Sequence, residues 1–233
     1  MSPRFNTPLA GALGLLAVVV LSACSADDLN IVVLSARAPG SSCDFSDDTK
    51  YVARGSLDLA PYSISGGTPV VTDQYYQVFS WQNNLTSNPI SVNGQVVDPG
   101  TGNSFIADTV VYSYQYSDPS VTLANESQNI RAVITAGGKS TDNSVPADLI
   151  QPQAFAAING STAIDTASQT LLVTLQYFGK LAAGGSTKNT NKVTFPLTIY
   201  RSAALVDCTG GKVPNGGVCG VPGRDQNVSC VSP

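Results

Sequence analysis

Apolar and polar residues alternate with a period of two in several short segments of this chain. In residues 110–116, Val110 and the tyrosines at every second position share one face, and Ser113 and Gln115 lie on the other. The other segments with such an alternation, or with a short apolar run, are 31–34, 92–96, 171–177 and 193–199. A period of two is typical of strands with one buried face, so these segments predict antiparallel strands. Residues 75–81 carry large apolar side chains on both faces, which predicts a central strand.

Turn signals separate the predicted strands. Gly-Gly pairs occur at 66–67, 137–138 and 184–185, and Asp-Pro pairs at 98–99 and 118–119. The chain has one Glu and one Met, so strong helix formers are few. About eight or nine strands without helical crossovers predict an all-β fold, an antiparallel β-sandwich of immunoglobulin-like or more elaborate type. Pro196, inside the last predicted strand, favours an edge position or a bulge.

The alternation ends near residue 205. From 206 to 233, Gly, Pro and Cys dominate. We therefore expect a β-sandwich domain at 31–205 and an irregular, disulfide-held C-terminal cap or tail at 206–233.

The N-terminus has the pattern of a secretory signal peptide at 1–23. Arg4 precedes an uncharged, largely apolar run, and acidic residues rather than a basic cluster follow it, which argues against a permanent membrane span. The run ends in Leu21-Ser22-Ala23-Cys24, which resembles the lipobox of bacterial lipoproteins. The resemblance implies cleavage before Cys24, acylation of Cys24 with lipid chains such as palmitate, and a short tether at 24–30. Ser25, where Asp would signal retention, resembles the pattern of lipoproteins sent to the outer membrane.

Four cysteines remain when Cys24 is set aside: Cys43, Cys208, Cys219 and Cys230. An even number in an exported chain predicts two disulfides, and four cysteines allow three pairings. Among these we expect Cys43–Cys208, which would join the start of the core to the end of its last strand, and Cys219–Cys230. The spacings and the absence of His argue against a zinc site.

Four segments carry a family resemblance: 55–59, 81–85, 193–199 and the tail 219–230. Together they resemble uncharacterised outer-membrane lipoproteins of myxobacterial type, which share a lipobox and a Cys-containing C-terminal tail. The resemblance implies the location and the architecture, and it brings no activity. In that family a Cys often follows the last strand directly. Here the seven residues 201–207 lie between the last predicted strand and Cys208.

Composition and motifs argue against an enzyme and against a nucleic-acid partner. The formal net charge is −4, so the chain has no excess of positive charge for nucleic acid. Without His, Ser-His-Asp and Cys-His catalysis are excluded, and the Ser-x-x-Lys and Gly-x-Ser-x-Gly motifs are absent. A glycosidase-type pair of carboxylates would need Glu126 and Asp residues that flank turns. We predict no cofactor.

Calcium is the ion that the sequence fits best, through Asp44, Asp47 and Asp48. The spacing of an EF-hand is missing, however, and acidic residues are common in exposed loops. We therefore predict no metal site.

The row of Tyr112, Tyr114 and Tyr116 is the most suggestive binding feature. Aromatic rows on a sandwich face can stack on sugars, but the opposite face of this strand is polar, so the tyrosine face is the better candidate for burial. Burial of the row would favour a packed module. Exposure in a groove beside a carboxylate would favour sugar binding.

The sequence therefore predicts a non-enzymatic, lipid-anchored cell-envelope protein that acts as a structural or binding module. Its expected partners are membrane lipid, through acylated Cys24, and an envelope protein or polysaccharide. The alternatives are a carbohydrate-binding, or even hydrolytic, surface lipoprotein and an assembly subunit that offers an edge strand to a partner.

Overall fold

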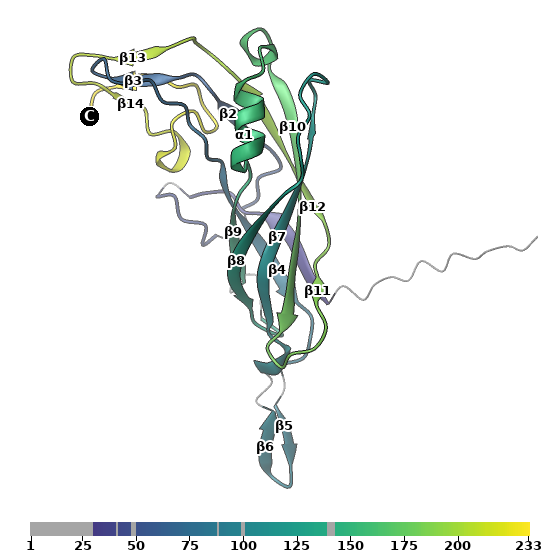
Figure 1. Ribbon diagram of the computed structural model, residues 1–233. Coiled ribbons are helices and arrows are strands. Elements are labelled where there is room, and N and C mark those ends of the chain that lie inside the picture. The colour runs from purple at the N-terminus through teal and green to yellow at the C-terminus, as the bar shows by residue number, and fades with distance from the viewer. Residues whose placement is uncertain (1–29, 41, 48–49, 88, 99–100, 139–142) are drawn as a thin grey trace, which may run out of the picture.

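The computed structural model describes residues 30–40, 42–47, 50–87, 89–98, 101–138 and 143–233, and its main body is a sandwich of two sheets (Figure 1). The smaller sheet has the order β1-β4-β9, with β1 at Ile31–Ala36, β4 at Tyr76–Asn83 and β9 at Ser144–Asp148. The larger sheet has the order β2-β12-β10-β7-β8, and β11 pairs with β10. Its strands are β2 (Gly55–Asp58), β7 (Phe105–Tyr116), β8 (Glu126–Ile134), β10 (Gln169–Leu181), β11 (Lys188–Asn189) and β12 (Val193–Tyr200). The predicted all-β sandwich is confirmed.

The core lies between the two sheets and follows the predicted alternation. Leu171, Val173, Leu175 and Tyr177 of β10 are fully buried, and the residues between them are partly exposed. From the smaller sheet, Trp81 lies across the Tyr177 ring with 4.4 Å between the ring centroids. As predicted, β4 is a central strand, and Val78 and Ser80 on its outer face are buried as well.

Two strand pairings are parallel rather than antiparallel. Residues 55–58 of β2 pair with 197–200 of β12, and β3 (Tyr62–Ile64) pairs with β13 (Val206–Cys208). The partners in each pair are more than 100 residues apart in sequence, so the long connection that parallel strands need is available. Strand β12 has β10 on one side along most of its length, but β2 joins its other side only from Leu197 onward. Pro196 therefore has a strand on one side only, a position where a missing N–H is tolerated.

Residues 90–98 form a hairpin where the alternation predicted a single strand at 92–96. Strands β5 (Ile90–Val92) and β6 (Gln95–Asp98) flank Asn93 and Gly94, which both have positive φ. An Asn-Gly pair in this conformation makes the two-residue turn that suits the twist of a hairpin, so the turn overrides the alternation. Figure 1 shows the hairpin projecting beyond one end of the sandwich.

The sequence analysis missed one helix, α1 at Pro152–Asn159. Its start and end carry ordinary signals, with Pro152 in the first turn and Gly160 directly after the end. It buries Ala154 and Ile158 against the core. Shorter 3₁₀ turns are η1 (Thr101–Asn103), η2 (Ala163–Asp165) and η3 (Val218–Gly220). Within the described residues, no helix is long and apolar enough to cross a bilayer.

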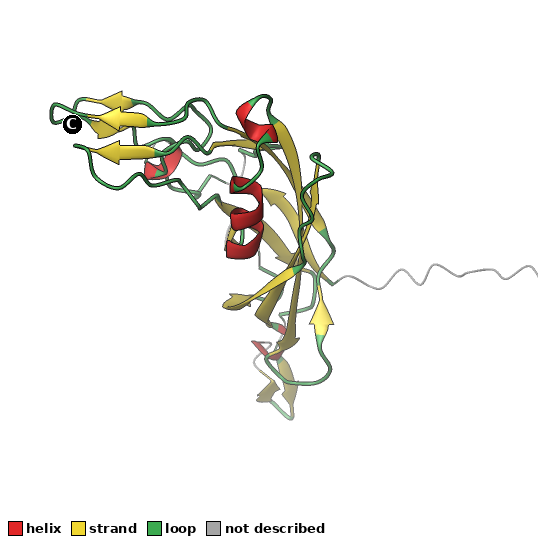
Figure 2. Ribbon diagram, turned by 45° about the horizontal axis from the view of Figure 1, so that its top comes forward, coloured by secondary structure: helices red, strands yellow, loops and turns green. Residues whose placement is uncertain are grey.

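The C-terminal segment is more ordered than the expected irregular tail. In addition to β13, it forms the short strands β14 (Val213–Pro214) and β15 (Cys230–Val231), which pair with each other. Figure 2 shows these strands as an arm at the end of the molecule opposite the β5–β6 hairpin. The root of the arm, residues 223–228, contacts β2 through backbone hydrogen bonds from Asp58 to the Gly223 carbonyl and from Asp225 to the Ser56 carbonyl.

Candidate functional site

The tyrosine row lies in the core. Tyr112 is fully buried, Tyr114 is 9% exposed and Tyr116 is half-buried. The Tyr112 hydroxyl donates a hydrogen bond to Gln128 (3.0 Å), and the Tyr114 hydroxyl accepts one from the backbone N–H of Gln151 (3.2 Å). Burial raises the pKa of all three, that of Tyr116 to about 12. The packing interpretation is thus confirmed for Tyr112 and Tyr114, whose faces offer no platform for a sugar.

The disulfide framework differs from the expected pairing. Two disulfides are present, but they join Cys43 to Cys219 and Cys208 to Cys230, so the expected Cys43–Cys208 and Cys219–Cys230 bonds are wrong. The reason lies in the arm. Strand β13 pairs with β3 in the arm, and this pairing places Cys208 next to Cys230 of β15 and away from the sandwich. Cys219 instead faces the loop that follows β1.

Asp58 attaches the root of the arm to the sandwich. This fully buried carboxylate accepts hydrogen bonds from the backbone N–H groups of Ala60, Ser202 and Val228, each at 3.0 Å, and from the Ser202 hydroxyl. The donors come from three separate segments. A buried carboxylate is stable only when its oxygens are satisfied in this way, so Asp58 fixes the three segments together.

A second contact between arm and sandwich involves Tyr75, Arg224 and Asp225. The guanidinium of fully buried Arg224 lies over the Tyr75 ring at 4.7 Å from its centroid, and the Tyr75 hydroxyl donates to Asp225 at 3.0 Å. Burial, followed by the charge of Asp225, raises the pKa of Tyr75. A Cβ on Gly55 would lie 1.8 Å from the Tyr75 hydroxyl, so only glycine fits there. Arg224 pairs with Asp225 through Nε at 3.4 Å, and its Nη1 is buried without a hydrogen-bond partner.

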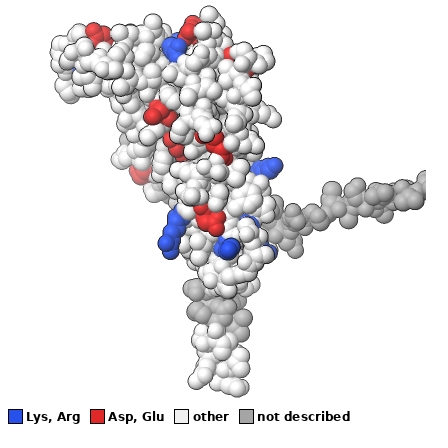
Figure 3. All heavy atoms as spheres, viewed as in Figure 1, with Lys and Arg blue, Asp and Glu red and all other residues white. Residues whose placement is uncertain are grey.

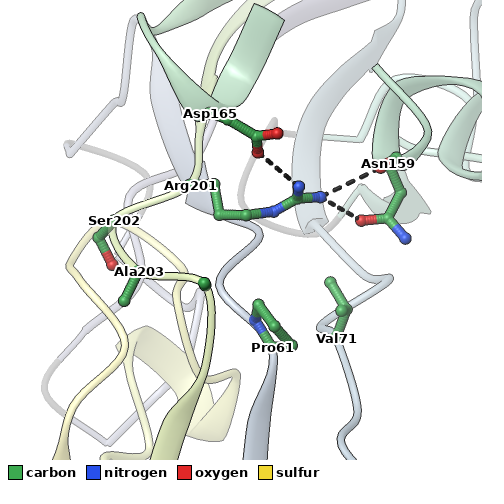
Figure 4. Close-up of a pocket in the computed structure, with 8 residues that line it drawn as sticks. Pro61, Val71, Asn159, Asp165, Arg201, Ser202 and Ala203 are labelled. Atoms are coloured by element: carbon green, nitrogen blue, oxygen red, sulfur yellow. Dashed lines mark hydrogen bonds and ion pairs between the residues drawn. The ribbon is translucent and has the colours of Figure 1, made fainter. Parts of the chain in front are cut away.

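A groove of about 650 Å³ lies at the end of the sandwich that bears the arm. Its lining comes from Pro61, Val71, Asn159 at the end of α1, Asp165 of η2, and residues 201–204 after β12. We call it the Arg201 groove. The side chain of Arg201 points toward Asp165 and Asn159, away from Ser202 (Figure 4).

Hydrogen bonds within the protein occupy the Arg201 guanidinium. Its Nη1 pairs with Asp165 at 2.6 Å, its Nη2 donates to the backbone and side-chain oxygens of Asn159 at 3.1 and 2.8 Å, and its Nε donates to the Leu59 carbonyl at 3.3 Å. The groove therefore has a rigid wall, and its charges are neutralised. Such a surface can hold a small polar or mixed ligand, but it presents no poised acid–base pair.

The sequence analysis did not identify the groove residues, because their role depends on the missed helix. Pro152 and Gly160, which bracket α1, were the only local signals for it. Glu126, weighed as a catalytic carboxylate, instead binds the N-terminus of α1.

The calcium candidates do not form a site in the part of the chain that the structure describes. There, no three His, Cys, Asp or Glu side chains lie close enough together to hold a metal ion. Asp44 accepts a hydrogen bond from the Ser46 hydroxyl, and Asp47 pairs with Lys50 at 3.1 Å. Asp48 lies outside the described residues, as does Cys24 with the predicted signal peptide.

Comparison of the chain with protein-family models, curated proteins and solved structures gives no match.

Proposed function

We propose that this protein is a non-enzymatic lipoprotein of the bacterial outer membrane, anchored through acylated Cys24, whose disulfide-held β-sandwich is a structural or binding module. The observation that carries the proposal is the use of the cysteines. The two disulfides take up Cys43, Cys208, Cys219 and Cys230, and the lipobox cysteine is the one left over. Disulfides indicate an oxidising compartment, and a single remaining thiol at the signal junction is the group that lipidation needs.

The start of the sandwich supports such an anchor. Asn30, the first described residue, accepts a hydrogen bond from the backbone N–H of Asn84 at 2.7 Å, and β1 follows at once. Asn30 lies six positions after Cys24, so the tether can span at most about 20 Å at roughly 3.3 Å per extended residue. The module would thus stand close to the membrane surface.

The module interpretation is favoured over sugar binding by the tyrosine row. A stacking platform needs exposed rings, and Tyr112 and Tyr114 are packed in the core. A partner from the envelope, protein or polysaccharide, would use the Arg201 groove, which is open and lined by both polar and apolar residues.

Mass spectrometry of the N-terminal peptide tests the anchor. Tryptic cleavage after Arg37 should release residues 24–37 with a mass increased by a diacylglyceryl group and, when the amine is acylated, a third chain. An unmodified Cys24 in the mature protein, or an uncut signal peptide in the major species, would refute the proposal.

Cell fractionation of the Cys24→Ser variant is the matching genetic test. We expect the variant to leave the membrane fraction or to stall uncut, while the Cys43→Ser/Cys219→Ser double variant, made as a control, keeps its lipid. Separation of the inner and outer membranes by density-gradient sedimentation tests the location. We expect the parent in the outer-membrane fraction and the Ser25→Asp variant shifted toward the inner-membrane fraction.

A further inference from the structure

We propose that the β5–β6 hairpin is a second membrane contact, whose valines enter the bilayer next to the lipid anchor. This inference rests on the proposed lipidation of Cys24. Val92, Val96 and Val97 of the hairpin are 53%, 59% and 61% exposed, an unusual concentration of apolar side chains on one small element. A two-stranded hairpin is only marginally stable in water, so a surface that covers these valines would also stabilise it.

The position of the hairpin relative to the tether indicates what covers it. The hydrogen bond between Asn84 and Asn30 joins the segment that enters the hairpin to the end of the tether. The base is closed by Asn103, whose side chain donates to the Thr86 carbonyl at 2.9 Å. Anchor and hairpin therefore leave the sandwich from neighbouring points.

Chain length allows both to reach the same surface. Cys24 lies within about 20 Å of Asn30, and the turn at Asn93 lies within about 30 Å of Asn84, at roughly 3.3 Å per residue. Figure 1 shows the hairpin as the outermost element at its end of the molecule. A lipid surface held at Cys24 would thus be within reach of the valines.

The charges near the hairpin favour a bilayer with anionic headgroups. The hairpin has no Lys or Arg, and its one charged residue is Asp98, the last residue of β6. The rest of the hairpin appears in Figure 3 as a white projection. Above it, exposed Lys180, Lys188 and Arg131 lie at the end of the larger sheet where β7 begins, since Lys180 pairs with Ile106 and Lys188 with Gly179. Asp108 is exposed on the same stretch of β7, and with Asp98 of the hairpin it makes two acidic residues against the three cations. An apolar tip below a basic rim is the arrangement expected of an interfacial anchor.

Fluorescence quenching in vesicles tests this contact. The native Trp81 is fully buried, so a tryptophan placed at Val96→Trp is the exposed reporter, and Ile64→Trp on β3 is the control. Ile64 is 53% exposed, similar to Val96, and lies at the opposite end of the molecule. The processed, lipidated full-length protein would be reconstituted into vesicles of phosphatidylethanolamine and phosphatidylglycerol, with or without brominated acyl chains.

We expect brominated chains to lower the emission at position 96 by about half or more and to leave that at position 64 unchanged, because bromine quenches only groups that reach the acyl region. Adding Val92→Asp and Val97→Asp should abolish the quenching, while the protein still floats with the vesicles through its lipid. Equal emission with and without bromine in a protein that floats would overturn the hairpin contact and leave the anchor standing.

Two further outcomes would overturn the inference in other ways. A protein that does not float and carries no acyl group on Cys24 would refute the proposed function, and the hairpin contact with it. Cross-linking of two hairpins to each other in the vesicles, with no quenching by bromine, would show that a second copy covers the valines. The unfolding midpoint of each hairpin variant should equal that of the parent, since the hairpin lies outside the core.

Discussion

The carboxylate of Glu126 on β8 accepts a hydrogen bond at 2.9 Å from the backbone N–H of Ala154 in the first turn of α1. Its other oxygen accepts from Gln153 at 3.2 Å. The helix's own N-cap, Gln151, makes no capping hydrogen bond with its side chain. The chain's single Glu thus satisfies, from another element, the N-terminus of the one α-helix found in the described residues, where a negative charge also favours the helix dipole.

Replacing Glu126 tests this capping. Glu126→Ala should lower the free energy of unfolding by about 1 kcal/mol, the usual value of a lost cap, as measured by urea denaturation. Glu126→Gln keeps an acceptor but loses the charge, so it should cost about half as much. Equal stability of the Ala variant and the parent would show that the helix does not depend on this contact.

Tyr114 separates packing from ligand binding. Tyr114→Ala should cost about 3–5 kcal/mol, because it leaves a cavity in the core. Tyr114→Phe removes only the hydroxyl that accepts the N–H of Gln151, so we expect a loss of about 1 kcal/mol. Chemical denaturation measures both. A Tyr114→Ala protein of parental stability that had lost binding to an envelope polysaccharide would restore the sugar-binding alternative.

The two disulfides should differ in their effect on stability. They close loops with sequence separations of 176 and 22 residues. In the chain-entropy model, the Cys43→Ser/Cys219→Ser variant should therefore lose about 2 kcal/mol more than the Cys208→Ser/Cys230→Ser variant. Non-reducing peptide mapping of the parent should recover the 43–219 and 208–230 pairs, and recovery of a 43–208 peptide would contradict the structure.

Asp148 should make stability depend on pH. Burial raises the pKa of this carboxyl, whose Oδ1 accepts the backbone N–H of Tyr75 at 3.0 Å. Because the folded-state pKa lies above that of the unfolded chain, the stabilisation is complete below the unfolded value, near 4, and is lost as the pH rises through the folded pKa.

Asp148→Asn keeps an oxygen acceptor for Tyr75 and removes the charge. We expect this variant to be at least as stable as the parent at pH 7, and the difference between the two to shrink as the pH falls toward 4 in matched denaturation curves. A variant that is less stable at pH 7, by a margin that does not change with pH, would contradict the desolvation argument.

The sequence by itself determined the sandwich strands and their buried faces. In β7, β10 and β12 the apolar residues recur at every second position, and that period matches the geometry of a strand whatever surrounds it. The same local logic identified the core tyrosines and the four cysteines that form disulfides.

Only the tertiary structure decided the features that depend on distant segments. The disulfide pairing follows from the route of β13 along β3, which brings Cys208 next to Cys230. Glu126 was weighed as a catalytic carboxylate, and no role was predicted for Asp58. The hydrogen-bond donors to these two carboxylates include backbone N–H groups from segments far along the chain. Hydrogen bonds and disulfides depend on which groups meet in space, and a local pattern carries no information about that.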